Sequence, residues 1–350
     1  MRSDLTSFLL VFSYGSFLLT FPNFGPVSLK IIETFKVSSY TFFSYFYIFH
    51  IGGIIFSLIF LDRVENRIRL LKIAVSLLIA FAFLATLSYL AVAAVGFLMG
   101  IFVVTFGSYF ARFVEPWKRG RIFAVSAFMS NIYLYLFMNY VEYDFLPALI
   151  LVSVAPLMLI YTIPEMTFEK VQSNLNRKFV YFSLPVFVFY LIGGVMYGIM
   201  EEAFRKAGIT THILFYAVII VFAGLIYDLI GRKSVAIAGL LAISASLLLF
   251  PSHLFYSAHL IQSSYAFVDV FGMVIWADLS RIGSEAKQYG IGMLFIVVPI
   301  YMGFILSSMF PFEMHMIIAI TLLVLSAFVI GLAEEPTTTP TDYMMWVARR

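Results

Sequence analysis

The sequence contains no cysteine and few charged residues. None of its 350 residues is cysteine, which excludes disulfide bonds and thiolate metal ligands. Asp, Glu, Lys and Arg make up 12% of the chain, about half of their share in soluble globular domains. No glycine loop has the spacing to Lys-Ser or Lys-Thr that cradles phosphate, which disfavours direct ATP hydrolysis. The composition therefore argues against a soluble globular domain.

Long apolar runs fill most of the chain. Hydrophobic residues make up 62% of it, and the mean hydropathy is +1.00. A bilayer core about 30 Å thick requires about 20 apolar residues per helix, so we predict an all-α membrane protein with twelve spans. The runs lack the period-two alternation of membrane barrel strands, and one uncharged stretch fits two spans, with a turn near Tyr89. The predicted spans are 7–24, 40–61, 70–89, 92–113, 121–140, 145–163, 180–200, 211–227, 234–250, 254–276, 290–309 and 315–333.

The basic residues predict the orientation. With the amino terminus inside, all but four of the 22 bases fall in inner segments; the outer four are Lys30, Lys36, Arg205 and Lys206. The positive-inside rule then places both termini in the cytoplasm, and we expect a plasma-membrane protein whose first span is retained. The net charge of +3 reflects this topology and requires no nucleic-acid partner.

Two polar loops recur at a fixed offset. "FLDRVENRIR" follows the second predicted span and "YDLIGRK" follows the eighth, and Asp228 lies 228 − 62 = 166 positions after Asp62. The same offset joins Arg67 to Lys233 and Arg121 to Lys287. A unit of six spans therefore occurs twice, as in transporters built of parallel repeats.

These loops resemble the signature of the major facilitator superfamily, in a prokaryotic type of transporter. The second loop is well formed, with Gly224, Asp228, Gly231, Arg232 and Lys233. The first loop keeps three signature residues, Asp62, Arg63 and Arg67, but has Leu58 and Glu65 where the family has glycine. The resemblance covers the whole chain. It implies two pseudo-symmetric six-helix bundles, at 1–163 and 180–333, joined by a cytoplasmic linker at 164–179 and followed by a cytoplasmic tail at 334–350.

The resemblance also implies a role for the two aspartates. In the family such an aspartate meets the positive amino-terminal end of a helix from the other half, a pairing that contributes about 0.3–2 kcal/mol. The implied partners are the start of the eleventh span near Gly290 for Asp62 and the start of the fifth near Arg121 for Asp228. These contacts would close the cytoplasmic side. For the bases alone, anchoring of the loops at lipid headgroups is favoured over gating.

Polar stripes mark candidate positions for substrate contact. The resemblance implies that spans one, four, seven and ten face the transport pathway, and each of them carries polar residues at helical spacing. Any one stripe could equally serve helix packing, and their coincidence on this set of spans favours a cavity. The candidates are Ser13, Ser16, Thr20, Asn23, Thr105, Arg112, Tyr190, Tyr197, Gln262, Tyr265, Asp269 and Trp276.

Asp269 is the one charged residue that we place near the middle of the membrane. A charge there costs about 2.5–3.5 kcal/mol on insertion scales, so such an acid is by default a functional hypothesis. We interpret it as the carrier of a coupling proton or as a contact for a cationic substrate group. The alternative is a neutral, packed acid bonded to a neighbour such as Tyr265. Because no embedded base is available, strongly anionic cargo is disfavoured, with Arg112 as the exception.

The sequence therefore predicts a proton-coupled secondary transporter for a small organic solute, acting by alternating access as a monomer in the bilayer. Efflux, as by an antiporter, is slightly favoured because the candidate positions are aromatic and sparsely charged. We expect no cofactor, no metal and no enzymatic activity. Two alternatives stay open, a membrane-embedded enzyme and a non-transporting receptor or assembly protein on the same fold.

Overall fold

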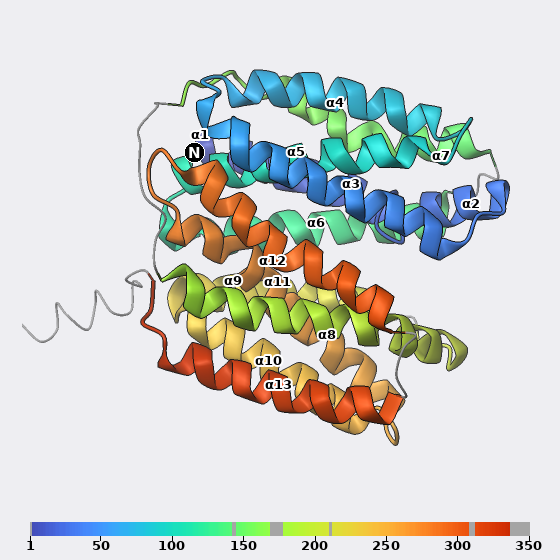
Figure 1. Cartoon of the computed structure of the whole chain (residues 1–350), viewed down its shortest axis with the longest axis vertical. Coiled ribbons are helices and arrows are strands. Elements are labelled where there is room, and N and C mark those ends of the chain that lie inside the picture. Colours follow the sequence, from blue (N-terminus) through green and yellow to red (C-terminus); the bar gives the residue numbers. More distant parts are fainter. Residues whose placement is uncertain (1, 142–144, 169–177, 210–211, 308–311, 337–350) are drawn as a thin grey trace, which may run out of the picture. The chain divides into compact units, whose positions relative to one another are not determined.

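The computed structural model describes residues 2–141, 145–168, 178–209, 212–307 and 312–336 (Figure 1). Most of the predicted linker (169–177) and tail (337–350) lies outside them. The described part is entirely helical and has no β-strand. Its α-helices are α1 (Arg2–Thr20), α2 (Pro26–Phe35), α3 (Ser39–Phe60), α4 (Arg67–Leu84), α5 (Ala91–Phe113), α6 (Arg119–Tyr140), α7 (Leu146–Val154), α8 (Phe179–Lys206), α9 (His212–Leu229), α10 (Arg232–Leu249), α11 (Leu254–Leu279), α12 (Glu285–Leu306) and α13 (Phe312–Leu332). Three 3₁₀ segments follow α3, α5 and α7: η1 (Leu61–Arg63), η2 (Pro116–Lys118) and η3 (Ala155–Thr162).

The helices match the apolar runs read from the sequence. Within the described residues, eight helical segments are long and apolar enough to cross a membrane. Three further apolar segments are shorter, and α4 carries three bases in its first turns. The turn predicted near Tyr89 is present between α4 and α5. The chain is thus a multi-pass helical membrane protein, and the count of twelve spans stays a prediction.

One short helix was not predicted. We expected the first span to continue to Phe24, but α1 ends at Thr20 and α2 begins at Pro26. Proline at a helix start is already fixed at a helical φ, and Lys36 ends α2 with a left-handed φ of 50°. At ten residues, α2 is too short to span a membrane, so a search for long apolar runs passes over it.

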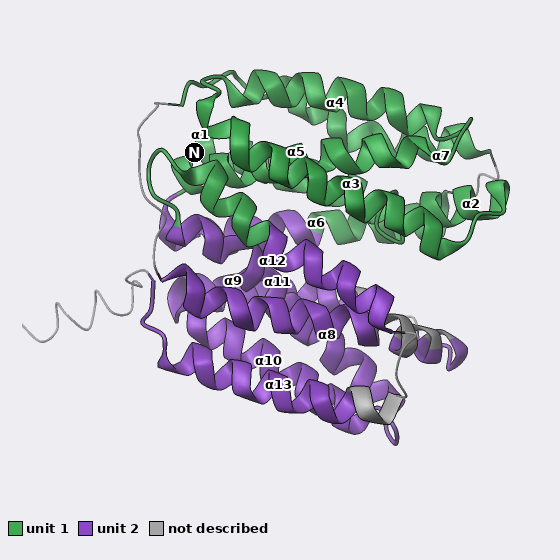
Figure 2. Cartoon of the chain, viewed as in Figure 1, with its two compact units in different colours: residues 1–114, 129–175, 280–293 green, residues 115–128, 176–279, 294–350 purple. Residues whose placement is uncertain are grey.

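The chain forms two compact units (Figure 2). Unit 1 comprises residues 1–114, 129–175 and 280–293, and unit 2 comprises residues 115–128, 176–279 and 294–350. Two helices are divided between the units. The first turns of α6 cluster with unit 2, and the first turns of α12 cluster with unit 1. The predicted division into 1–163 and 180–333 stays a prediction.

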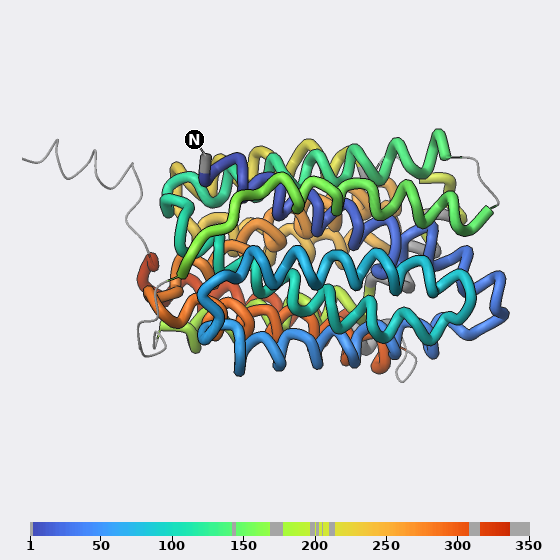
Figure 3. The backbone as a smooth tube through the Cα atoms, turned by 90° about the horizontal axis from the view of Figure 1, so that it is seen from above, coloured from blue at the N-terminus to red at the C-terminus, as the bar shows by residue number. Residues whose placement is uncertain are grey.

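Glycines allow the helices of each unit to pack closely. In unit 1, a Cβ on Gly100 of α5 would come within 2.4 Å of the carbonyl oxygen of His50 in α3. In unit 2, a Cβ on Gly303 of α12 would come equally close to the carbonyl oxygen of Leu191 in α8. Small residues are what membrane helices use to bring backbones together. The path of the chain through α3, α4 and α5 can be followed in Figure 3.

Side-chain caps define where α3 and α4 begin. Ser38 accepts a hydrogen bond from the amide of Thr41 at 3.0 Å, and Asn66 accepts one from the amide of Arg69 at 2.9 Å. Each cap satisfies a backbone donor that has no partner inside its helix. The cap at Asn66 fixes the start of α4, and with it the position of the first signature loop.

Candidate gating contacts and an intramembrane acid

The first Asp–helix contact joins the loop after α3 to the start of α12, within unit 1. The two carboxylate oxygens of Asp62 accept hydrogen bonds from the amides of Ala286 and Lys287 at 3.0 and 2.9 Å. These amides belong to the first turn of α12, where backbone donors have no partner in the helix. The carboxylate therefore completes the helix end and faces the positive end of its dipole.

Two arginines and a glutamate surround this contact. The Nη2 of Arg67 donates to Asp62 at 2.9 Å, and the Nη1 of Arg112 donates to Glu285 at 3.1 Å. Arg67 is 1% exposed, and its guanidinium carbon lies 4.1 Å from the centre of the Phe168 ring. A buried guanidinium is held by carboxylates and by an aromatic face in this way. Arg63, the third signature residue that this loop keeps, is exposed.

The second Asp–helix contact joins the end of α9 to the start of α6, within unit 2. Asp228 accepts from the amide of Gly120 at 2.8 Å and from the amide of Arg121 at 2.9 Å. The Nε of Arg121 adds a third bond at 3.0 Å. Asp228 is fully buried, so these donors take the place of water around its charge. Both backbone contacts that the family resemblance implied are therefore present.

A buried charge cluster surrounds the second contact. Asp278, at the end of α11, accepts from Arg119 at 2.7 Å, from the Nε of Arg232 at 2.8 Å and from the hydroxyl of Tyr227 at 2.8 Å. Arg232 also donates to the carbonyl of Pro116 at 2.9 Å. The expectation that Arg232 reaches lipid headgroups is wrong, because its side chain is 0% exposed and enclosed in this cluster.

The turn of the second loop needs glycine and is closed by an acid from beyond α13. Gly231 has a φ of 144°, a conformation that side chains disfavour, which explains the glycine of the signature. Glu335 accepts from the amide of Arg232 at 2.6 Å, at the start of α10. The Nζ of Lys233 donates to the carbonyls of Gly331 and Ala333. Burial raises the pKa of the Glu335 carboxyl, and its hydrogen bonds from the two amides of α10 oppose that rise.

The intramembrane acid is held by two tyrosines in unit 2. Asp269 of α11 accepts a hydrogen bond from the hydroxyl of Tyr190 in α8 and one from the hydroxyl of Tyr216 in α9, both at 2.8 Å. The two phenols donate to different carboxylate oxygens. Among the described residues, no Lys, Arg or His lies within salt-bridge distance of Asp269, which is partly exposed. The predicted partner Tyr265 does not bond it; its ring packs edge-on to Phe189 at 5.5 Å.

The two hydroxyl donors favour the ionised form of Asp269. A hydrogen bond to a charged group contributes about 1.5–3 kcal/mol, so two of them match the cost of about 2.5–3.5 kcal/mol for a charge at this depth. A protonated carboxyl still accepts hydrogen bonds, but its hydroxyl oxygen is a weaker acceptor, so protonation would weaken the bond from one tyrosine. The site can hold a negative charge, and no basic side chain in the described part of the chain pairs with it.

The other candidate positions of unit 2 are packed or lie outside the description. Gln262 is 7% exposed and Trp276 is fully buried, with its ring 4.9 Å from that of Phe179. Tyr197 is one of the residues whose side chains the structure does not describe. Neither Gln262 nor Trp276 has a hydrogen bond or ring contact with Asp269 in the described part of unit 2.

Most of the polar stripe on α1 bonds to other parts of unit 1. Ser13 donates to the carbonyl of Pro156 at 2.8 Å, and Thr20 and Ser153 share a hydrogen bond of 2.7 Å. Asn23, beyond the end of α1, accepts from Tyr47 at 2.7 Å. These bonds correspond to the packing alternative. The hydroxyl of Ser16 is buried and has no hydrogen-bond partner among the described residues, and Thr105 of α5 bonds within its own helix.

Sequence reasoning missed Tyr216 and the inner charge clusters. Tyr216 lies on a span outside the set that the family resemblance assigns to the pathway, so no stripe drew attention to it. The clusters had a signal that was not used. The 166-residue offset joins Arg112 to Asp278 and Arg119 to Glu285, and each pair carries opposite charges.

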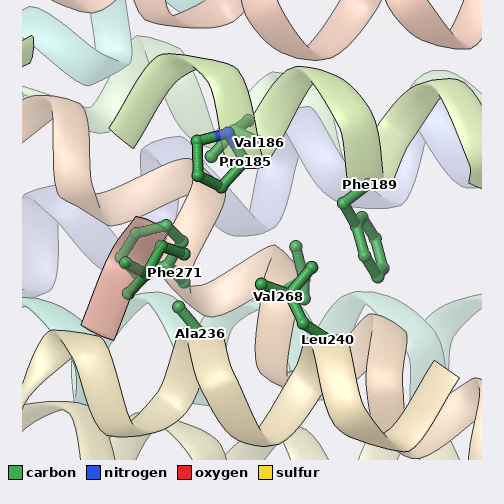
Figure 4. Close-up of a pocket in the computed structure, with 8 residues that line it drawn as sticks. Pro185, Val186, Phe189, Ala236, Leu240, Val268 and Phe271 are labelled. Atoms are coloured by element: carbon green, nitrogen blue, oxygen red, sulfur yellow. The ribbon is translucent and has the colours of Figure 1, made fainter. Parts of the chain in front are cut away.

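Two hollows lie in the described parts of the units, and neither is lined by the intramembrane acid. One hollow in unit 2 is lined only by apolar side chains, including Pro185, Phe189 and Phe271 (Figure 4). Its volume of about 10 Å³ holds at most one water molecule. A second, of about 170 Å³ in unit 1, is lined in part by Ser3, Tyr109 and Glu165. Neither hollow reaches Asp269.

Comparison with solved structures identifies the fold. No protein-family model and no curated protein matches the sequence. Among solved structures, the proton:xylose symporter XylE of the major facilitator superfamily, bound to 6-bromo-6-deoxy-D-glucose, is 16% identical, with a TM-score of 0.71 over 99% of this chain and 98% of that one. The human organic anion transporter MFSD10 (TETRAN) is 10% identical, with a TM-score of 0.72 over 94% and 99%. A bacterial homologue of the iron transporter ferroportin, in an outward-facing state, is 14% identical, with a TM-score of 0.65 over 94% and 98%. The chain therefore has the fold of major facilitator superfamily transporters over almost its whole length.

Proposed function

We propose that the chain is a secondary active transporter that moves a small organic solute across a membrane by alternating access, coupled to protons. The fold supports transport as the general activity, because the similar solved structures are transporters and none of those named above is an enzyme. The cargoes named for these proteins or for their stated relative, xylose, organic anions and iron, differ from one another. Fold similarity therefore supports the class of activity, and the cargo has to be argued from this chain's own residues.

The observation that carries the proposal is the acid in α11. Asp269 is partly exposed, lies among hydrophobic residues and has two hydroxyl donors but no basic partner among the described residues. A carboxylate in that setting attracts a cation, because no basic side chain among the described residues already neutralises its charge. A proton or a cationic group of the substrate would each do so. Coupling follows if the two compete for, or share, this carboxylate.

The two Asp–helix contacts support alternating access. Each holds a helix start by hydrogen bonds to one carboxylate, and such contacts form and break as units. We propose that both are closed when the transporter is shut on its predicted cytoplasmic side and that they separate when that side opens. The residues of the gating set are Asp62, Arg63, Arg67, Gly224, Asp228, Gly231, Arg232 and Lys233. The surrounding charge clusters would then be parts of the same closure.

The proposed cargo is a neutral, cationic or amphipathic organic molecule, with export slightly favoured. The two residues that bond Asp269 are tyrosines, and aromatic rings with one acid suit an organic cation better than an anion. Arg112 is the one base among the candidate positions, and it is engaged by Glu285. An anionic cargo would therefore have to displace an existing ion pair.

Transport by the purified protein in liposomes tests the proposal. A panel of neutral, cationic and amphipathic solutes would be measured with and without a pH gradient. We expect gradient-dependent movement of at least one class, and its loss in Asp269→Asn. Tyr190→Phe and Tyr216→Phe should each impair this transport. The control is Tyr256→Phe, which changes an exposed tyrosine on α11, the helix of Asp269, and should leave transport unchanged. Unchanged transport and unchanged pH dependence in Asp269→Asn would overturn the coupling role.

The two rival functions have less support. A membrane-embedded enzyme would need clustered catalytic groups, and no group of three or more His, Asp or Glu residues that could hold a metal occurs among the described residues. A receptor or assembly protein would keep the fold and would show no movement of solute in the liposome experiment.

A further inference from the structure

At the second Asp–helix contact, glycine is required on α9. A Cβ on Gly224 would lie 2.4 Å from the Cβ of Ala124 and 2.6 Å from the carbonyl oxygen of Gly120, both on α6. Real Cβ atoms do not approach other atoms so closely, so a side chain here would push the start of α6 away. The carboxylate of Asp228, one turn further along α9, would then lose the amides that it bonds at 2.8 and 2.9 Å.

The first contact has leucine at the corresponding position. The 166-residue offset joins Gly224 to Leu58, and a leucine in the setting of the second contact would hold the two helices apart. The bonds of the first contact are nevertheless as short as those of the second, at 3.0 and 2.9 Å. Something else must therefore provide the space that the missing glycine would have left.

That space is provided by Gly290 on the opposite helix. The same offset joins Ala124 of α6 to Gly290 of α12, so the residue facing the signature position is glycine at the first contact and alanine at the second. A Cβ on Gly290 would lie 2.8 Å from the Cδ2 of Leu58, 3.1 Å from its Cγ and 3.4 Å from the Cγ2 of Val104. The start of α12 that carries Gly290 clusters with unit 1, as Figure 2 shows.

We propose that Gly290 is a positioning residue of the first contact: it makes room on α12 for the side chain of Leu58, which occupies the position that Gly224 has at the second contact. At the first contact, Leu58 fills the space beside Gly290. The small residue therefore lies on α12 at the first contact, whereas at the second contact glycine lies on α9. This inference rests on the proposed gating function for its consequence in transport. The packing itself stands on the geometry of unit 1.

A cysteine at position 286 reports the state of the first contact. Ala286 is buried, and its amide, one of the two donors to Asp62, is retained in Ala286→Cys. The natural chain has no cysteine, so this thiol is the only one that a maleimide reagent can label. Labelling would be measured in membrane vesicles, together with the melting temperature of the purified protein.

The expected result is a defect with a specific rescue. Gly290→Ala should raise the labelling rate about fivefold, which is the low end for overpacking, because the new methyl group meets the side chain of Leu58 and no backbone atom. Leu58→Ala removes the clashing atoms, so Leu58→Ala with Gly290→Ala should return to the parent rate. Leu58→Ala alone, which adds no atoms, is the control for folding.

The second contact provides a matched comparison. Gly224→Ala should not be rescued by Ala124→Gly, because the carbonyl oxygen of Gly120 would still lie 2.6 Å from the new Cβ. The state of the second contact is measured by maleimide labelling of Ser126→Cys, which is a near-isosteric change at a buried position of α6. Rescue at the first contact and none at the second is the expected pattern.

Two outcomes would overturn the proposal: an unchanged labelling rate in Gly290→Ala, or a double variant at positions 58 and 290 that labels as fast as Gly290→Ala alone. The proposed gating function fails separately. If Asp62→Asn leaves both labelling and transport unchanged while Gly290→Ala is rescued by Leu58→Ala, the packing of the joint stands and its role in gating does not.

Discussion

Replacing Asp228 by asparagine should open the second Asp–helix contact. The buried carboxylate accepts from two backbone amides, at 2.8 and 2.9 Å, and asparagine keeps only one accepting oxygen. One amide is then left without a partner, which costs about 1–3 kcal/mol, and the loss of charge at the helix start removes about 0.3–2 kcal/mol more. The bond from the side chain of Arg121 is left out of the sum, because that side chain is 42% exposed and such pairs contribute little.

The sum is about 1–5 kcal/mol, with a centre near 3 kcal/mol, which corresponds to about a hundredfold shift toward the open contact. The assay is the rate of maleimide labelling at Ser126→Cys in membrane vesicles. The control is Glu115→Gln, which removes an exposed acid that pairs with Lys118 just before α6. A labelling rate in Asp228→Asn within about twofold of the parent, in protein that melts normally, would refute this reasoning.

Three further predictions test the remaining sites. Asp269→Asn should bind a cationic solute about tenfold more weakly in equilibrium dialysis, because a hydrogen bond to a charged group contributes about 1.5–3 kcal/mol; equal binding would contradict the cation role. Asp278→Ala should destabilise the protein by about 3–5 kcal/mol in a denaturation series, because it leaves Arg119 and Arg232 without their shared carboxylate; a loss below about 1 kcal/mol would contradict this role. Carboxyl NMR should show the neighbours Glu334 and Glu335 titrating on opposite sides of 4.5. The hydrogen bond and charge of a lysine lower the pKa of Glu334, so its stabilising contribution is lost as the pH falls through this lowered pKa. Burial raises the pKa of Glu335, so its contribution to stability becomes more favourable as the pH falls.

The sequence was most informative where one physical requirement acted alone. A helix that crosses a membrane must be long and apolar, so the predicted ranges and the helices agree to within a few residues at most ends. The requirement is silent about α2, whose ten residues carry Lys30 and Glu33 on a partly buried surface helix. The sixth predicted span, 145–163, is α7 continued by the 3₁₀ segment η3, a change of helix type that hydropathy does not report.

The sites were predicted in part, for a similar reason. The two aspartates stood out because acids are not explained by the positive-inside rule, and their backbone partners followed from the family resemblance. The tyrosine at position 216 did not stand out, because phenols are common in this chain and only the fold brings α9 beside α11. The arginine at position 232 looked like a surface anchor, and only the structure shows the carboxylate of Asp278 that makes its burial tolerable.

The two contacts carry their glycine on different sides, at Gly290 in the first and at Gly224 in the second, and this difference also constrains the ancestry of the two halves. If the duplicated unit began with the arrangement still present at Gly224 and Ala124, two substitutions separate it from the present first joint. Acquiring leucine first would have forced its side chain against a methyl group, whereas acquiring glycine at position 290 first would have left only a small void. We therefore expect that glycine arose on α12 before leucine arose at position 58, and that descendants of an intermediate with both glycines would still close.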